Sequence, residues 1–263
     1  MTPRRRPVVL SIAGSDNSAG AGAQADLKTL SYLGCYGVTA ITCVVAEVPG
    51  KVSAIQTVRP DIVGEQIALS FSAFPISSAK TGMLYSSAII KTVARELSGK
   101  RTKLVVDPVM VASSGDSLLQ KSAITAYRKE LFPLATLVTP NLDELRILAE
   151  GDIRSLDEIK DAGKYLVETY GCAFLLKGGH LRGKLAIDVL VTPKSLNEFA
   201  APFIPGVKTH GTGCTYSAAI AAGLARGRAL PDAVLAAKDY VTTSIRNSLR
   251  WKKTQALDHF PDE

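Results

Sequence analysis

The sequence predicts an α/β fold, a three-layer arrangement in which helices cover both faces of a mostly parallel central sheet. Short apolar runs rich in β-branched residues alternate with segments of helical period along the chain. Unbroken apolar runs are typical of parallel strands that are buried on both faces. The chain has 263 residues, 46% of them hydrophobic, which is enough for one sizeable core. We therefore expect a single domain over residues 1–263.

The expected elements follow one another in a regular order. The predicted strands are 8–13, 38–46, 79–84, 104–106, 136–138 and 173–176. The predicted helices are 23–33, 61–71, 86–97, 155–170, 213–226 and 231–249, with a further helix beginning near Leu142. Gly34 ends the first helix and Pro60 stands just ahead of the second, as helix boundaries favour. The runs 186–191 and 199–204 are expected to form a late hairpin at one edge of the sheet.

The charge of the chain argues against a nucleic-acid partner. Its 31 Lys and Arg residues exceed its 24 Asp and Glu residues, giving a net charge of +7. Apart from 4–6 and 250–253, the basic residues are dispersed, and they form no basic stripe with interleaved aromatic residues. A basic surface around a site for an anionic substrate explains this charge better.

No membrane, zinc or disulfide signal stands out either. The apolar run 8–14 is short for the core of a signal peptide and is closed by Asp16, so we interpret it as a buried strand. No later run is long enough to span a bilayer. The four cysteines form no C-x-x-C pair, which favours reduced thiols in a cytoplasm. Three of them, Cys35, Cys43 and Cys172, lie in apolar segments and are expected in the core.

Polar and glycine-rich residues recur where predicted strands end. They are Gly14 to Asp16, Glu47, Lys80 to Met83, Asp107, Thr139 to Asn141 and Lys177 to His180. In open α/β sheets, ligands bind beyond the carboxyl ends of the strands. This convergence predicts one ligand site more strongly than any single motif does.

A phosphate cradle is predicted at Gly211, Thr212, Gly213 and Cys214, just before a helix rich in small residues. Glycines let successive backbone N–H groups point at one spot, and the helix start adds its positive dipole end. A phosphoryl group in transfer needs such fixed donors. A thiol at a helix start also favours thiolate, so Cys214 is a candidate proton acceptor. The alternatives are a glycine-rich packing turn and a small buried cap residue.

Charged residues near this cradle suit a nucleotide and its metal. Asp107 follows a strand, and Asn141 and Glu144 share the first turn of a helix. One or two carboxylates and several waters are typical of Mg²⁺ on a nucleotide. Asn141 and Glu144 are equally consistent with a capping box, and the two interpretations are compatible. Lys177 is a candidate for neutralising ATP phosphates, with a solvated strand-end lysine as the alternative.

Gly20-Ala21-Gly22 offers a different interpretation, a dinucleotide fingerprint of an oxidoreductase. The match is poor, because Ala25 replaces the third glycine and the loop is long and polar. A loop that closes around a small polar substrate fits these residues better.

Together these motifs resemble the hydroxymethylpyrimidine and phosphomethylpyrimidine kinases of thiamine biosynthesis, in the ribokinase-like superfamily. The resemblance runs from Val9 to about Asn247. Its strongest parts are AGSD at 13–16, GAGAQADLKT at 20–29, KTGML at 80–84, DPVM at 107–110, TPNLDE at 139–144, KGGH at 177–180 and THGTGCT at 209–215.

The resemblance implies a ribokinase-like fold, ATP and Mg²⁺ as cofactors, and a homodimer. It implies phosphorylation of 4-amino-5-hydroxymethyl-2-methylpyrimidine, a small heterocyclic alcohol, and then of its monophosphate. It places Gly14, Ala21, Asp26, Met83 and Val109 around the pyrimidine. It further implies that ATP contacts Lys177, Asn141 and Thr209, that Asp107 and Glu144 surround the metal, and that Cys214 is the counterpart of the basic aspartate of sugar kinases.

Glu47 departs from this family pattern, in which a glutamine is common after the second strand. A glutamine amide donates and accepts hydrogen bonds, whereas an ionised glutamate only accepts. Glu47 could therefore accept from an amine or favour a protonated ring. It also leaves open a pyridoxal or pyridoxine kinase, or a kinase of a related heterocycle. A catalytically silent metabolite-binding protein is a further alternative, against which the intact cradle, Asp107 and Lys177 argue.

Overall fold

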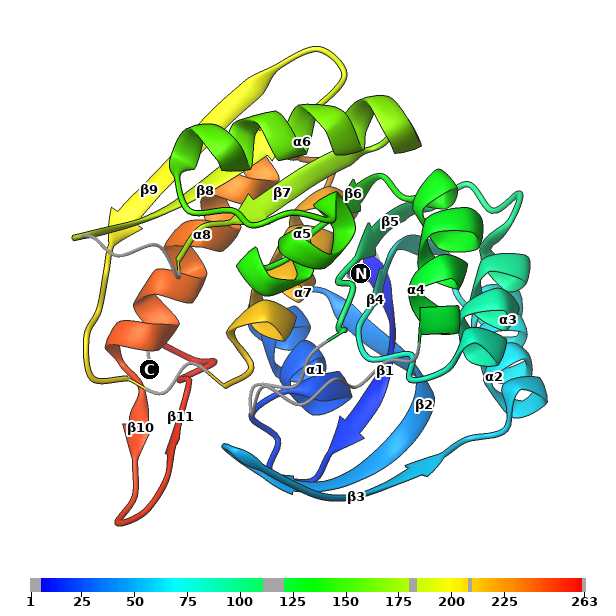
Figure 1. Cartoon of the computed structure of the whole chain (residues 1–263). Coiled ribbons are helices and arrows are strands. Elements are labelled where there is room, and N and C mark those ends of the chain that lie inside the picture. The colour runs from blue at the N-terminus through cyan, green and yellow to red at the C-terminus, as the bar shows by residue number, and fades with distance from the viewer. Residues whose placement is uncertain (1–5, 111–120, 180–183, 208–209, 262–263) are drawn as a thin grey trace, which may run out of the picture.

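The computed structural model describes residues 6–110, 121–179, 184–207 and 210–261, and in them a nine-stranded sheet carries helices on both faces (Figure 1). The strands are β1 (Val8–Asp16), β2 (Tyr36–Val48), β3 (Lys51–Thr57), β4 (Ile76–Thr81), β5 (Lys103–Val106), β6 (Leu137–Val138), β7 (Ala173–Lys177), β8 (Leu185–Val191) and β9 (Leu196–Pro202). Their order in the sheet is β3-β2-β1-β4-β5-β6-β7-β8-β9.

The predicted parallel sheet is confirmed, and antiparallel strands occur only towards its two edges. Strands β2, β1, β4, β5, β6 and β7 run parallel to their neighbours within this group, whereas β3, β8 and β9 pair antiparallel. The late hairpin of β8 and β9 was expected from the sequence. Strand β3 was not, because most of its side chains are exposed and it therefore lacks an apolar run.

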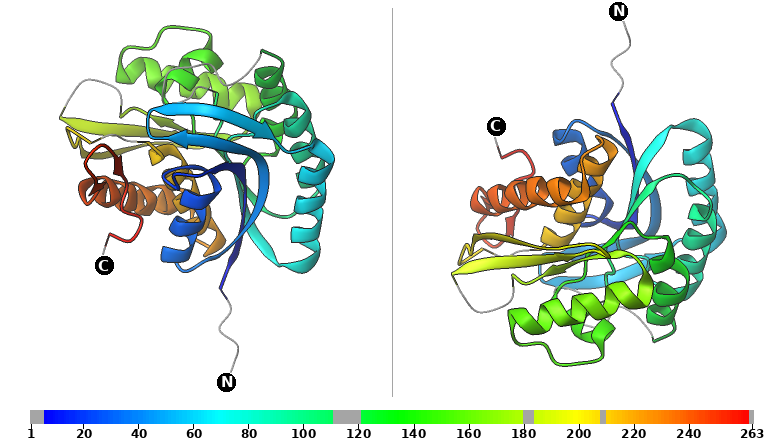
Figure 2. Two further views of the ribbon diagram at one scale, coloured as in Figure 1. Left: turned by 90° about the horizontal axis from the view of Figure 1, so that it is seen from below. Right: turned by 90° about the horizontal axis from the view of Figure 1, so that it is seen from above.

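The helices form two layers on opposite faces of the sheet (Figures 1 and 2). They are α1 (Gly22–Tyr32), α2 (Pro60–Ala73), α3 (Ser87–Leu97), α4 (Lys121–Ala126), α5 (Leu142–Ala149), α6 (Leu156–Tyr170), α7 (Thr212–Ala225) and α8 (Leu230–Arg246). Helices α1, α7 and α8 lie on one face, and α2 to α6 lie on the other. Short π-helical and 3-10 turns, Tyr127–Leu131 and Phe132–Leu134, follow α4.

Two apolar cores result from the alternation of side chains along each buried strand. In β5, Leu104 and Val106 join the core under α2 to α6, while Val105 joins the core under α7 and α8. Helix α7 is buried along most of its length, which explains why its predicted segment consists of small residues. Cys35, Cys43 and Cys172 are buried, as expected.

Element ends differ from the sequence predictions where tertiary contacts intervene. Strand β4 ends at Thr81, so Met83 lies beyond its carboxyl end. Helix α8 ends at Arg246 instead of Leu249, because Leu249 and Arg250 form β10, which pairs with β11 (Gln255–Ala256) in a small hairpin.

Candidate active site

A cavity of about 790 Å³ lies at the carboxyl ends of the parallel strands. Strand order reverses between β1 and β4, since β1 leads to β2 on one side and β4 lies on the other. Such a switch point is where an α/β sheet opens a crevice for ligands. The predicted residues that line the cavity are Gly14, Ala21, Glu47, Met83, Asp107, Val109, Asn141, Glu144, Lys177, Gly211, Thr212, Gly213 and Cys214.

The glycine-rich cradle forms the start of α7. Gly211 is the N-cap residue, and its φ of 84° lies in the left-handed region that favours glycine. A side chain at Gly211 would overlap the carbonyl oxygen of Gly20. The buried hydroxyl of Thr212 has no hydrogen-bond partner within the part of the chain that the structure describes. The cradle therefore offers unpaired donors at a helix start, as anion sites do.

A buried ion pair faces this cradle. Lys177 Nζ lies 3.0 Å from Asp107 Oδ1, which also accepts a hydrogen bond from the Thr139 hydroxyl at 3.1 Å. A Cβ atom built on Gly213 would lie 3.3 Å from the same Nζ. Burial acts to lower the pKa of Lys177, but Asp107 and Glu144 hold that pKa above its ordinary value. A cation thus stands opposite the cradle, where phosphate charge would be held between them.

Asn141 and Glu144 form the capping box that the sequence predicted. Asn141 Oδ1 accepts the Glu144 N–H at 2.9 Å, and Glu144 Oε2 accepts the Asn141 N–H at 2.8 Å. Burial raises the pKa of Glu144 to about 7, with the Asp107 charge adding to it and Lys177 opposing it. The box caps α5 and also places a second carboxylate near Asp107 at the cavity.

Cys214 is a partly exposed residue of the cradle, but its thiol group is buried and is not primed as a thiolate. Burial raises its pKa to about 11, and this outweighs the lowering by Lys80 and by the Gly22 N–H that Sγ accepts. The position of Cys214 at a helix start had suggested a lowered pKa for its thiol, which is the opposite direction. In the free enzyme Cys214 is therefore a neutral thiol at pH 7.

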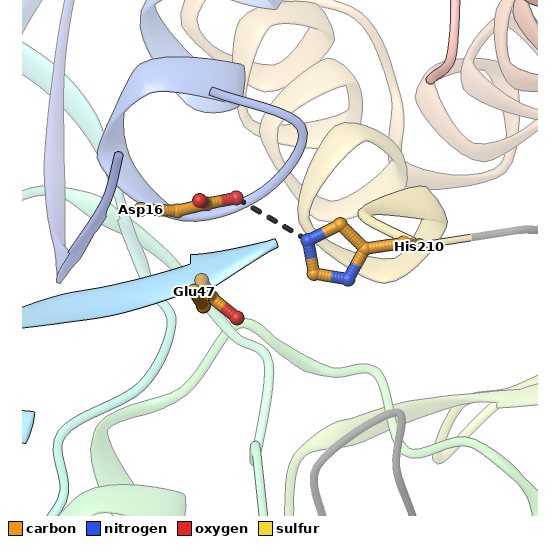
Figure 3. Close-up of side chains that lie close together, drawn as sticks. All are labelled: Asp16, Glu47 and His210. Carbon is orange, nitrogen blue, oxygen red and sulfur yellow. Dashed lines mark hydrogen bonds and ion pairs between the residues drawn. The ribbon is translucent and has the colours of Figure 1, made fainter. Parts of the chain in front are cut away.

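Asp16, Glu47 and His210 line the same cavity and point toward one another (Figure 3). His210 Nε2 lies 3.2 Å from Asp16 Oδ2. Burial works against the charge on Asp16, but hydrogen bonds from His210, Ser18 and the Ala21 N–H keep its pKa below the ordinary value. The bond to Asp16 raises the pKa of His210. Asp16 thereby joins the loop after β1 to the start of the cradle.

Glu47 is the member of this cluster that remains open to a ligand. Its carboxylate accepts no hydrogen bond from any residue of the described ranges, although its backbone N–H donates to Asn17. Burial and the neighbouring Asp16 charge raise its pKa. A half-buried carboxylate in this state needs a hydrogen-bond donor, which a ligand in the cavity can provide.

One predicted site residue of the described ranges does not line the cavity. Asp26 is fully buried beneath the cavity, where it pairs with Lys80 at 2.9 Å and accepts from the Ser11 hydroxyl at 2.5 Å. It therefore supports the floor in this structure and does not face the cavity. Thr209 lies outside the described residues.

Sequence reasoning placed Lys80 among the strand-end residues but did not predict its pairing with Asp26. It missed a second buried pair, Asp188 and Lys238, whose charged atoms lie 2.6 Å apart in the cavity wall. Asp188 also accepts the Gly178 N–H. The signals for these residues were weak, a lysine inside a strand and one aspartate in the apolar run of β8. Each charge is compensated by its partner within the fold, so removing one partner would leave the other buried and unpaired.

No helix in the described ranges is long and apolar enough to cross a membrane. An anion cradle opposite a lysine, with carboxylates beside them, serves phosphoryl transfer rather than hydride transfer. The fold and site thus define a small-molecule kinase of the α/β class.

The comparisons with known proteins agree with this class. Residues 16–257 match the phosphomethylpyrimidine kinase family. The hydroxymethylpyrimidine/phosphomethylpyrimidine kinase of Aquifex aeolicus is 40% identical over 254 residues, covering 96% of this chain and all of that protein. The thiamine biosynthesis bifunctional protein ThiED of Geobacter sulfurreducens is 42% identical over 93% of this chain, which spans half of that longer protein.

Solved structures give the same fold. The pyridoxal kinase of Staphylococcus aureus in complex with ADP has a TM-score of 0.91 at 33% identity, covering 98% of this chain and 95% of that chain. A phosphomethylpyrimidine kinase from Clostridium difficile has a TM-score of 0.81 at 36% identity, and the match covers 91% of this chain and 100% of that chain. The chain belongs to the phosphomethylpyrimidine kinase family and is a phosphotransferase with the expected ribokinase-like fold.

Proposed function

We propose that this kinase transfers the γ-phosphate of ATP to the hydroxymethyl group of 4-amino-5-hydroxymethyl-2-methylpyrimidine, and then phosphorylates the monophosphate to the diphosphate. The names of its relatives in thiamine biosynthesis support this acceptor. The observation in this chain that carries the choice of ring is the open carboxylate of Glu47 at the cavity.

Glu47 favours an aminopyrimidine over pyridoxal for a simple hydrogen-bonding reason. The aminopyrimidine carries an N–H donor beside its hydroxymethyl group, whereas pyridoxal carries a formyl oxygen there, which only accepts. An ionised carboxylate accepts from the amine and repels the formyl oxygen. The likeness to pyridoxal kinases keeps that activity as the second candidate.

Lys177 and the cradle are proposed to hold the phosphates. Lys177 would exchange part of its contact with Asp107 for phosphate oxygens, and the N–H groups from Gly211 to Cys214 would receive the moving phosphoryl group. Asn141 lines the same part of the cavity. ADP and AMP-PCP complexes of related kinases support ATP as the donor.

The donor set at Asp107 and Glu144 fits Mg²⁺. Both are carboxylates at the cavity, and the Asp107 charge contributes to the raised pKa of Glu144, a repulsion that a cation would relieve. These two residues would hold the ion together with water. When bound with ATP, Mg²⁺ supplies positive charge that neutralises the phosphates.

Cys214 is proposed to orient the acceptor hydroxyl as a neutral thiol. Because its pKa is about 11, only a small fraction is thiolate at pH 8, so proton removal is not its resting-state role. We expect Cys214→Ala to lower kcat roughly tenfold, the scale of lost orientation. Undiminished turnover of Cys214→Ala would remove the thiol from the mechanism.

We also propose a cytoplasmic homodimer. Val44 and Val48 on β2 are each 52% exposed, and burying such apolar side chains favours association with a second copy. Light scattering should give a molar mass of twice that of the chain. Val44→Glu should lower the measured mass towards that of the monomer. A monomer at all concentrations of the parent protein would exclude this proposal.

One kinase panel tests the proposed function. ATP consumption is measured with hydroxymethylpyrimidine, its monophosphate, pyridoxal and pyridoxine. We expect the highest kcat/KM with the pyrimidine and turnover of its monophosphate. A preference for pyridoxal would refute the acceptor assignment, and ATP binding without consumption for any acceptor would support a silent binding protein.

A further inference from the structure

The C-terminal residues return to the first turn of the cradle helix. After the β10–β11 hairpin, the segment 257–261 packs beside α8 and α1 (Figures 1 and 2). Leu257 is 2% exposed and His259 is 3% exposed, so this segment is part of the folded interior. A polar ring buried this deeply needs partners.

Contacts outside the cradle fix the position of His259. The Tyr240 hydroxyl donates to the His259 carbonyl oxygen at 2.9 Å, and the Asp258 N–H donates to the Ser244 carbonyl at 3.2 Å. Phe260 packs edge-on against Tyr32, with ring centroids 6.0 Å apart. The backbone that carries the imidazole is therefore held by α8 and α1 independently of α7.

The imidazole in turn contacts Thr215, the residue that follows Cys214. His259 Nε2 lies 3.1 Å from Thr215 Oγ1, and both side chains are buried. The Leu257 backbone acts on the same ring and favours its protonation, against the effect of burial. In a neutral imidazole one nitrogen donates and the other accepts. We assign the tautomer with the proton on Nδ1, in which Nε2 accepts and the Thr215 hydroxyl donates. Burial, with Lys28 nearby, lowers the pKa of His259 to about 4, which keeps the ring neutral at pH 7.

Without this acceptor the Thr215 hydroxyl would have another partner. A threonine in a helix can donate to the carbonyl four residues earlier, and such bonds bend helices. For Thr215 that carbonyl belongs to Gly211, which already accepts the Thr215 N–H at 2.9 Å. Ser217 illustrates the competing bond, because its hydroxyl donates to the Gly213 carbonyl at 2.8 Å.

We propose that His259 is a positioning residue for phosphoryl transfer. By accepting the Thr215 hydroxyl, it keeps that hydroxyl away from the Gly211 carbonyl and so fixes the direction of the cradle N–H groups. His259 touches neither nucleotide nor acceptor in this role. The inference concerns phosphoryl transfer and does not depend on which acceptor is correct.

The test compares His259→Leu with the double variant His259→Leu/Thr215→Val. We expect the single variant to lose roughly tenfold in kcat with KM for ATP nearly unchanged, because a misdirected cradle affects the transition state. In the double variant the competing hydroxyl is absent, so most of kcat should return. Turnover is measured with whichever acceptor of the panel is phosphorylated, which separates this test from the acceptor assignment.

Phe260→Ala is the matched control, because it loosens the same segment without touching Thr215. It should lower Tm but leave kcat within roughly twofold at temperatures below both transitions. Equal losses of kcat in Phe260→Ala and His259→Leu, or no recovery in the double variant, would overturn the proposal. If His259→Leu does not fold, the single variant Thr215→Val tests the proposal. A loss of roughly tenfold in the kcat of Thr215→Val would also overturn the proposal.

Discussion

Replacing Glu47 by glutamine should change which ring the enzyme prefers. The substitution keeps the size of the side chain and one accepting oxygen, but it removes the charge and adds an N–H donor. Glu47 lines the cavity, is half-buried, and has no hydrogen-bond partner among the described residues. A ligand amine should therefore make its main ring-end contact with this carboxylate.

The expected size follows from the chemistry of that contact. A hydrogen bond to a charged group contributes about 1.5–3 kcal/mol, against about 1 kcal/mol for a neutral one. Losing the difference should lower kcat/KM for the aminopyrimidine roughly tenfold. For pyridoxal the new amide N–H can donate to the formyl oxygen, which should raise kcat/KM severalfold. The ratio of the two values should move by roughly 10- to 100-fold.

The assay measures kcat/KM for both acceptors at several pH values in the parent enzyme and in Glu47→Gln. The pKa of Glu47 is raised, so the preference of the parent enzyme for the amine should be complete at high pH and should weaken as pH falls through that pKa. Comparing each acceptor in both proteins cancels the titration of the acceptor itself. In Glu47→Gln this component of the pH dependence should disappear.

Asp143→Asn supplies the matched control, because Asp143 lines the same cavity but is 62% exposed and pairs with Arg146 at 2.9 Å. The same change of acid to amide there should leave the acceptor ratio unaltered. A ratio that moves less than roughly threefold in Glu47→Gln would refute the argument for Glu47 as the selector of the ring.

Three further outcomes are expected from the buried groups of the site. Lys80→Met should lower the free energy of unfolding by about 3–5 kcal/mol in urea titrations, because it leaves the buried Asp26 charge unpaired. The double variant Lys80→Met/Asp26→Leu should recover most of this loss. Equal stability of the two variants would contradict the explanation. Since the pKa of Glu144 is about 7, the apparent affinity for Mg²⁺ in activity titrations should be higher at pH 8 than at pH 6, and Glu144→Gln should lose this difference. Gly211→Ala should lower kcat by roughly 100-fold or more. An alanine there would have to adopt the left-handed backbone conformation, and its Cβ would overlap the Gly20 carbonyl oxygen beside the cradle. Gly227→Ala shares the positive φ but has no atom within 4 Å of its Cβ, so it should affect stability alone.

The sequence alone determined the layered fold, because unbroken apolar runs such as 104–106, alternating with helical segments, are typical of strands covered by helices on both faces. It also determined the cradle and the Asn141–Glu144 capping box, since both depend on residues close together in the chain. The resemblance in its motifs pointed to the family that the comparisons then confirmed.

Only the tertiary structure decided features that depend on burial or on distant partners. It placed Asp26 beneath the cavity with Lys80, 54 residues away in the chain. It raised the pKa of Cys214, because the desolvation of a buried thiol outweighs the helix start that the sequence displayed. It also brought His210 to Asp16 and His259 to Thr215, contacts that local sequence cannot encode. Local motifs in the sequence thus indicate the type of reaction, while solvation and long-range packing set the charge and the orientation of the groups that carry it out.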